Sequence, residues 1–185
     1  FLNFKISDQY FQAQISMILK HLDDYGKSNI GSGKQANVEF VSANPTGPLT
    51  VGHGRNAIIG DTISNLLAWN GFNVTREYYF NDAGRQMRIL ADSVEARYFQ
   101  ISDNNFQFPN EGYQGNYIKD IAESIWQNKG GQLETGATIF KEKAEKVIFS
   151  DIKKSLNKLG IHFDKYTNEK TFYENGSIDD LLKNL

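Results

Sequence analysis

The chain has 185 residues, of which 20 are basic and 22 acidic, so its formal net charge is −2. This near balance argues against a whole-chain electrostatic clamp for nucleic acid or for an anionic membrane. Hydrophobic residues make up 39% of the chain, which excludes a disordered polypeptide, and cysteine is absent, which excludes disulfides, thiolate metal sites and cysteine nucleophiles.

The hydropathy pattern bears on location. No apolar run approaches the roughly 20 residues of a membrane span, and no basic segment leads into the apolar core of a signal peptide. We therefore expect a cytoplasmic protein without membrane contact. The sequence starts at Phe1 without an initiator methionine and stops at Leu185 inside an apolar helical pattern, which we interpret as a piece of a longer protein.

The first elements are a strand and a helix. Residues 1–6 alternate in the manner of a strand, and Ser7 and Asp8 are typical of a helix cap. The helix that follows has apolar residues at the spacing of a buried face: Phe11, Ile15, Ile18, Leu19 and Leu22. The glycine-containing segment 26–35 predicts a flexible connector and is the best candidate for a domain boundary.

The middle of the chain alternates strands and helices. A strand is predicted over 38–41, and the two prolines within 42–49 predict an irregular segment after it. A helix from about Gly52 or His53 to Asn70-Gly71 has one apolar face made of Ile59, Ile63, Leu66 and Leu67. Residues 74–80 predict a strand whose aromatic end belongs to the sheet core, and Asn81-Asp82 predicts the cap of the next helix. The expected buried side of that helix is Met87, Leu90, Ala91, Val94 and Tyr98.

The strand–helix–strand–helix order predicts an α/β fold with a parallel sheet. Residues 101–115 predict a polar and aromatic loop. Two helical patterns follow, one with Ile118, Ile121, Ala122 and Ile125, the other with Phe140, Ala144, Val147, Ile148 and Ile152. Residues 162–166 predict a short strand, and Ser177 predicts the cap of a last helix with Ile178, Leu181 and Leu182.

The segment 38–62 carries the most chemical information. Gly52 and Gly54 at the start of a helix allow backbone amides to approach an anion, and His53 and Arg55 add side-chain donors there. Open α/β sheets bind ligands at the carboxyl edge of their strands. The sequence therefore predicts a phosphate or carboxylate site, although the two glycines by themselves are equally consistent with tight strand–helix packing.

The same residues also match a dinucleotide-binding pattern. Residues 52–57 fit G-x-G-x-x-A, and Glu77 follows at about the 20-residue spacing of the acid that binds a ribose hydroxyl. That pattern requires its glycines in the turn directly after the first strand, whereas Pro45 and Pro48 intervene here. The alternative of a dinucleotide-binding oxidoreductase domain is therefore disfavoured.

The run from Ser42 to Arg55 resembles the signature region of class I aminoacyl-tRNA synthetases, and in particular that of bacterial arginyl-tRNA synthetases. The class motif His-x-Gly-His reads Thr50-Val51-Gly52-His53 here. Residues 38–48 upstream, 59–61 on the helix and 76–87 after it are similar to the same family. Weaker similarity at 113–115 and 159–164 extends the resemblance over nearly the whole chain.

The resemblance implies a fold and a reaction. The fold is a Rossmann-like parallel sheet with flanking helices and a helical insertion. Residues 1–30 would be the end of an N-terminal tRNA-binding domain with a linker helix, and 36–185 the first part of the catalytic domain. The reaction is attack of the L-arginine carboxylate on ATP, which yields arginyl-adenylate, and transfer of the arginyl group to tRNA(Arg). Mg²⁺ would arrive with ATP, without a dedicated protein metal site, and the protein would be a monomer.

Site residues are also implied by the resemblance. ATP would be held by the continuous run Ala43, Asn44, Pro45, Thr46, Gly47, Pro48, Leu49, Thr50, Val51, Gly52 and His53. His53 and Thr50 would be catalytic, and Glu39, Ser42 and Asn44 would bind arginine. Three of these residues also have simpler interpretations. Glu39 could face solvent, His53 could cap the helix or pack in the core, and Asn44 before a proline is a common turn former.

Two positions depart from the family pattern. Thr50 stands where the first histidine of the motif is expected, and a hydroxyl can donate a hydrogen bond but carries no charge. We expect Thr50 by itself to support catalysis less well than histidine, with compensation nearby. Some members of the family lack a lysine in their later Lys-Met-Ser-Lys loop and carry a compensating lysine at the position of Gly47. Because this chain has glycine there, we expect the Lys-Met-Ser-Lys loop, which would lie beyond this chain, to be complete. A stand-alone nucleotide-binding module that does not charge tRNA remains the main alternative.

Overall fold

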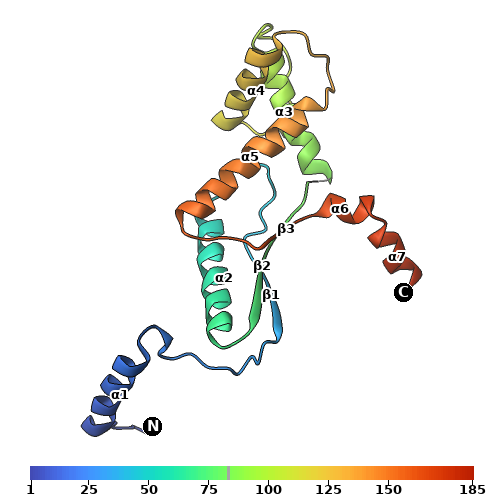
Figure 1. The fold of residues 1–185 in the computed structure, drawn as a ribbon. Coiled ribbons are helices and arrows are strands. Elements are labelled where there is room, and N and C mark those ends of the chain that lie inside the picture. Colours follow the sequence, from blue (N-terminus) through green and yellow to red (C-terminus); the bar gives the residue numbers. More distant parts are fainter. Residues whose placement is uncertain (83) are drawn as a thin grey trace.

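The computed structural model describes residues 1–82 and 84–185. In chain order its elements are α1 (Asp8–His21), the short 3₁₀ helix η1 (Leu22–Asp24), β1 (Gln35–Glu39), α2 (Val51–Trp69), β2 (Asn73–Phe80), α3 (Gly84–Phe99), α4 (Asn116–Lys129), α5 (Ile139–Lys158), β3 (Lys165–Asn168), α6 (Glu169–Glu174) and α7 (Ser177–Lys183) (Figure 1). None of the helices in these described ranges is long and apolar enough to cross a membrane.

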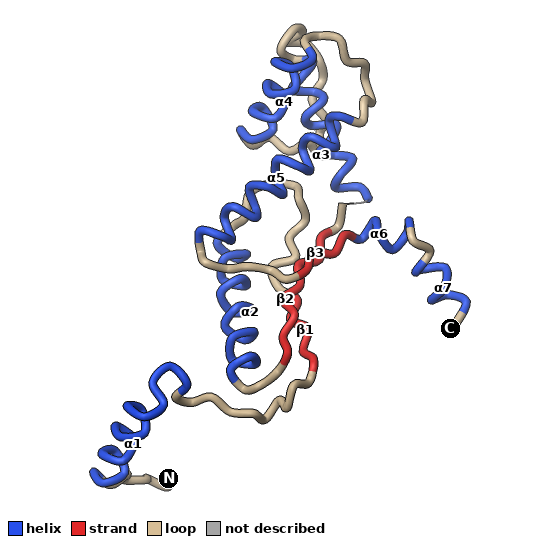
Figure 2. Tube along the Cα trace, viewed as in Figure 1, coloured by secondary structure: helices blue, strands red, loops and turns tan. Residues whose placement is uncertain are grey.

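The three strands form one parallel sheet in the order β1-β2-β3 (Figure 2). Glu39 pairs with Glu77 between the first two strands, and Phe80 pairs with Asn168 between the last two. Helix α2 is the crossover from β1 to β2, while α3, α4 and α5 are inserted between β2 and β3. The predicted α/β fold with a parallel sheet, flanking helices and a helical insertion is confirmed.

One continuous hydrophobic core joins the sheet to the insertion. Tyr78 and Phe80 on β2 are buried as predicted, and the Phe80 ring stacks on Phe149 of α5 with centroids 4.4 Å apart. The predicted buried faces of α3, α4 and α5 are confirmed at most positions. Val147 is an exception, with 38% of its surface exposed, because the contact of α5 with its neighbours is centred on Phe140, Ala144 and Ile148.

Helix α2 reverses the expected pattern. Its buried residues are Ala57, Gly60 and Ser64, whereas Ile59 and Ile63 are 48% and 45% exposed. The reason is close approach, because a Cβ atom at residue 60 would overlap the Phe40 side chain just beyond β1. Small residues therefore face the sheet, and the apolar stripe lies on the uncovered side of the helix in the described chain.

The N-terminal predictions are corrected in three respects. Residues 1–6 are not a strand, and among the described residues the sheet consists of β1, β2 and β3 without them. Ser7 does cap α1, with its Oγ accepting from the Tyr10 amide at 3.3 Å, but the apolar face of α1 is exposed rather than buried. The connector is held in place, because the amides of Gly31 and Gly33 donate to Asn70 and Gly71 at the end of α2, each at 2.8 Å.

The C-terminal predictions are shifted rather than lost. The last strand covers 165–168 instead of 162–166, and Gly176 in the left-handed region, not Ser177, is the cap residue of α7. Asp82 is almost fully buried and accepts from the Lys170 amide of α6 at 3.2 Å, so it caps α6. The prediction that Asn81-Asp82 caps α3 involves residue 83, which lies outside the described residues. Asp82 serves a helix 88 residues away because the β2 and β3 ends lie side by side.

Candidate functional site

The site begins where β1 ends. Val41 and Ser42 have φ angles of 65° and 40°, and positive φ is unfavourable for a β-branched residue such as valine. Two hydrogen bonds hold this turn: Asn56 Oδ1 accepts from the Val41 amide at 2.5 Å, and Ser42 Oγ accepts from the Tyr79 amide at 3.2 Å. The strained turn directs the following segment, residues 43–50, across the carboxyl end of the sheet toward α2.

Tyr78 anchors the start of this segment. Its hydroxyl accepts from the Ala43 amide at 3.1 Å and donates to the Ala43 carbonyl at 2.8 Å. The side chain is fully buried, and burial raises the pKa of Tyr78 well above its ordinary value, so the phenol keeps the proton that it donates.

Further contacts hold the segment from the insertion. Asn44 Nδ2 donates to Gln86 Oε1 of α3 at 2.7 Å, and the Tyr117 hydroxyl of α4 donates to the Thr46 carbonyl at 2.7 Å. Pro45 between them is buried. The predicted irregular segment is thus a loop that is hydrogen-bonded to β2, α3 and α4.

His53 forms part of the start of α2. Its Nδ1 accepts from the amide of Thr50, the cap residue, at 3.0 Å, and the Gly54 amide donates to the Thr50 carbonyl at 3.1 Å. Because Nδ1 is the acceptor, the proton of the neutral ring lies on Nε2, which is left to donate to another group. His53 therefore does take part in capping the helix, and this contact fixes the orientation of its ring.

The helix start presents unused backbone donors beside this ring. In the described part of the chain, no hydrogen bond takes up the amides of Val51 and Gly52. A Cβ atom at Gly54 would meet no atom within 4 Å, so the surface there is open. Exposed amides at a helix N-terminus favour an anionic group.

Glu39 lies at the other side of the loop. It is the last residue of β1 and is exposed, as the simpler alternative for this residue had it. Glu169 directly follows β3, whose last residue Asn168 pairs with Phe80, so Glu39 and Glu169 both lie at the carboxyl edge of the sheet. The pKa of Tyr79 on the strand between them is raised, first by burial and then by Glu169, Tyr173 and Glu39. Sequence reasoning missed Glu169, since nothing in the local pattern indicates that β3 returns beside β2.

Glu77 is not available for a ribose. Its Oε2 accepts from Asn37 Nδ2 at 2.6 Å, and its Oε1 lies 2.9 Å from Lys165 Nζ and accepts from the Thr167 hydroxyl. These hydrogen bonds, that of Thr167 first, lower the pKa of Glu77 to about 2. The carboxylate links all three strands, so the geometry gives no support to the dinucleotide-binding alternative.

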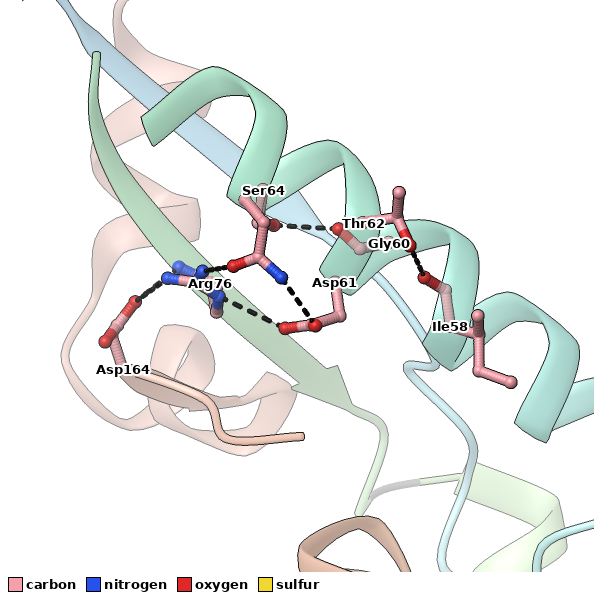
Figure 3. Close-up of polar contacts among 8 residues, drawn as sticks. Ile58, Gly60, Asp61, Thr62, Ser64, Arg76 and Asp164 are labelled. Atoms are coloured by element: carbon pink, nitrogen blue, oxygen red, sulfur yellow. Dashed lines mark hydrogen bonds and ion pairs between the residues drawn. The ribbon is translucent and has the colours of Figure 1, made fainter. Parts of the chain in front are cut away.

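A second polar cluster lies between α2 and β2 and was not predicted (Figure 3). The Arg76 guanidinium donates to Asn65 Oδ1 at 2.6 Å and lies 3.5 Å from Asp61 Oδ1, both on α2. The Arg76 amide donates to Asp164 Oδ2 at 2.8 Å. The cluster joins α2, β2 and the segment before β3. Its only sequence signal was that residues 61, 76 and 164 lay within the runs similar to the synthetase family.

Within the described residues, no group of three or more histidine and carboxylate side chains is arranged to hold a metal ion.

Comparison with known proteins agrees with this architecture. Residues 14–148 match the family model described as "tRNA synthetases class I (R), catalytic domain". The arginine–tRNA ligase of Desulfotalea psychrophila is 46% identical over 100% of this chain, and that of Pelodictyon phaeoclathratiforme is 48% identical over 94%. These alignments cover 34% and 32% of the relatives, so the chain spans about a third of their length.

Solved structures show the same relationship. A Campylobacter jejuni crystal structure assigned as an arginyl-tRNA synthetase superimposes with a TM-score of 0.78 at 29% identity, over 96% of this chain and 40% of the other. The Plasmodium falciparum arginyl-tRNA synthetase superimposes with a TM-score of 0.56 over 97% of this chain and 33% of the other, and at 19% identity it shows the fold alone. The chain therefore belongs to the arginyl-tRNA synthetase family of class I synthetases.

Proposed function

We propose that the complete protein activates L-arginine with ATP, forming arginyl-adenylate and pyrophosphate, and transfers the arginyl group to tRNA(Arg). The observation that carries the proposal is the hydrogen-bonded 43–50 loop, which leads into a helix start where His53 Nε2 and the amides of Val51 and Gly52 have no hydrogen-bond partner among the described residues. This chain would supply part of that site, with the remainder beyond Leu185.

ATP would bind along residues 43–53. Attack of a carboxylate on the α-phosphorus needs no enzyme nucleophile, so catalysis rests on positioning and on donors directed at the developing negative charge. His53 Nε2 and the amides of Val51 and Gly52 are such donors, and Thr50 keeps the His53 ring in place. Mg²⁺ would neutralise the phosphates as part of the bound nucleotide.

Arginine would bind between Asn44 and Glu39. Asn44 would hydrogen-bond the main-chain groups of the amino acid, with Ser42 beside it. The guanidinium group favours carboxylates, which it can engage through paired hydrogen bonds. Glu39, the exposed last residue of β1, and Glu169, which follows β3 at the same edge of the sheet, support this end of the site as the guanidinium pocket.

The remaining assignments follow from the family and are part of the proposal. Residues 1–30 would close an N-terminal tRNA-binding domain, and residues 36–185 would form the first part of the catalytic domain. The complete protein would act as a cytoplasmic monomer, and the chain alone would not charge tRNA.

Arginine-dependent exchange between ATP and pyrophosphate tests the proposal, with and without tRNA(Arg), on the complete polypeptide encoded by the gene and on this chain side by side. We expect exchange only in the complete protein. His53→Ala should lower its rate by about 10²–10³-fold, the typical cost of one transition-state donor. The matched control is His162→Ala, an exposed histidine paired with Asn157, which should leave the rate unchanged.

Two results would contradict the proposal. A complete protein that binds ATP but shows no exchange with arginine and tRNA would point to a nucleotide-binding module. Full exchange by the 185-residue chain would show that the proposed division of the active site is wrong.

A further inference from the structure

Tyr117 connects the helical insertion to the 43–50 loop. It lies in the first turn of α4, and its hydroxyl donates to the Thr46 carbonyl, 71 positions earlier, at 2.7 Å. The side chain is half-buried, and burial raises the pKa of Tyr117, so the hydroxyl remains a donor. This is a contact between a helix of the insertion and the middle of the loop that we propose to bind ATP.

Two glycines make room for the Tyr117 ring. A Cβ atom at Gly47 would lie 3.0 Å from the Tyr117 hydroxyl and 3.3 Å from Cζ, and a Cβ atom at Gly115 would overlap the ring edge. Gly47 does not have a positive φ, so its backbone conformation does not require glycine. A side chain at residue 47 would therefore press against the Tyr117 hydroxyl.

The contact fixes a peptide plane. In a trans peptide the C=O and N–H groups point in opposite directions, so a Thr46 carbonyl held by Tyr117 turns the Gly47 N–H to the other side of the loop. In the described part of the chain nothing accepts from the Gly47 amide. The hydrogen bond therefore leaves a fixed donor without a partner, within the segment 43–53.

We propose that Tyr117 is a positioning residue that orients the Thr46–Gly47 peptide so that the Gly47 N–H donates to an acceptor atom of bound ATP. The proposal rests on the proposed function for the identity of the ligand. The orientation of the peptide by Tyr117 stands on the contacts alone, and can be tested in the free protein.

The first test uses Tyr117→Phe in the complete polypeptide, with Tyr113→Phe as the matched control. Tyr113 is also half-buried and close in sequence, but its hydroxyl makes no hydrogen bond to the described residues. Losing the tether should raise the KM for ATP by about three- to tenfold, the range for one hydrogen bond, with little change in the KM for arginine. Amide hydrogen exchange in peptides covering 42–53 should become faster in the free Tyr117→Phe protein and stay unchanged in the control.

A second test uses Gly47→Ala, alone and combined with Tyr117→Phe. The added methyl group displaces the hydroxyl, so the single substitution should also raise the KM for ATP. Because both changes break one contact, the double variant should be much less impaired than the product of the two single effects.

The outcomes separate this inference from the proposed function. If the wild-type protein neither binds ATP nor catalyses exchange, the proposed ligand is wrong, while faster hydrogen exchange in Tyr117→Phe would still establish the tether. If the wild type is active and Tyr117→Phe changes neither the KM for ATP nor the exchange of 42–53, the positioning role is overturned. An equal rise in both KM values, or a loss of kcat alone, would also overturn it by indicating general damage to the site.

Discussion

The Tyr78 hydroxyl hydrogen-bonds both backbone groups of Ala43, as acceptor at 3.1 Å and as donor at 2.8 Å. The buried Tyr78 side chain on the central strand therefore satisfies the backbone N–H and C=O of Ala43, the first residue of the 43–50 loop, as a neighbouring strand would. This contact connects the sheet core with the site, because Tyr78 also packs against Phe149 and Phe163.

Tyr78→Phe should destabilise the protein by about 1–3 kcal/mol, the cost of leaving buried backbone groups without partners. Urea unfolding measures the change. Tyr166→Phe is the matched control, since Tyr166 lies beside Tyr78 on β3 but its hydroxyl makes no hydrogen bond in the described structure. Equal losses for the two variants would show that the Ala43 contact contributes nothing.

Two glycines of α2 should respond in opposite ways to alanine. Gly60→Ala places a methyl group on the Phe40 side chain, and overpacking of this kind costs about 1–3 kcal/mol. At Gly54 a methyl group meets no atom, so Gly54→Ala should stabilise the helix by about 0.5–1 kcal/mol. Thermal unfolding of both variants tests the close approach of α2 to the sheet, and a stabilising Gly60→Ala would refute it.

The Arg76 cluster should contribute more than a surface ion pair. Arg76 is only 21% exposed and contacts two residues of α2, so Arg76→Met should cost about 1–2 kcal/mol in urea unfolding. The control is Arg85→Met, which breaks the pair with Glu111 between side chains that are 71% and 63% exposed. That pair should be worth about 0–1 kcal/mol. A larger loss at Arg85 than at Arg76 would contradict a bridging role for the cluster.

Glu77 should make stability depend on pH in the acid range. Its pKa is lowered from 4.5 to about 2 in the folded protein, so the folded state favours the ionised form. This stabilisation is complete above the unfolded pKa and is lost as the pH falls toward the folded pKa. Glu77→Gln should therefore have a lower free energy of unfolding than the wild type at pH 7, and this difference in stability should disappear as the pH falls from 4.5 to 2.

Urea midpoints measured across this range test the prediction for Glu77, with Glu134→Gln as a control at an exposed carboxylate. A gap between the wild type and Glu77→Gln that stays constant with pH would show that the three-strand link does not depend on the charge.

Thr50→His should raise the rate of arginine activation in the complete polypeptide. The Thr50 amide would still donate to His53 Nδ1, since that donor belongs to the backbone, and the new imidazole would add a donor that can carry charge. Arginine-dependent pyrophosphate exchange measures the effect. An unchanged rate would show that Thr50 is not at a disadvantage and that compensation nearby is complete.

Local patterns were sufficient for much of the architecture. The spacing of apolar residues located α3, α4 and α5 and their buried faces, because these helices cover one another with large side chains. Proline at 45 and 48 correctly indicated an irregular loop before α2, since proline fixes φ and lacks an amide donor. The same loop carried the residues that resemble the synthetase signature.

The packing of α2 could not be predicted in this way. Periodicity shows that a helix has two different faces, but not which face meets the sheet or how closely. Here α2 lies so close to Phe40 that only a residue without a side chain, Gly60, fits at the contact. Ile59 and Ile63 lie on the other side of the helix, which no part of the described chain covers.

Contacts between distant segments were also beyond the sequence. Asp82 accepts a hydrogen bond from the first turn of α6, Glu169 lies at the same sheet edge as Glu39, and Tyr117 reaches Thr46 across 71 positions. The sequence was sufficient to predict the secondary structure of the central region and the irregular loop before α2, because propensity, capping and proline geometry act over a few residues. The side chains that hold that loop became visible in the folded chain alone, because their hydrogen bonds join residues that the parallel sheet and its helical insertion bring together.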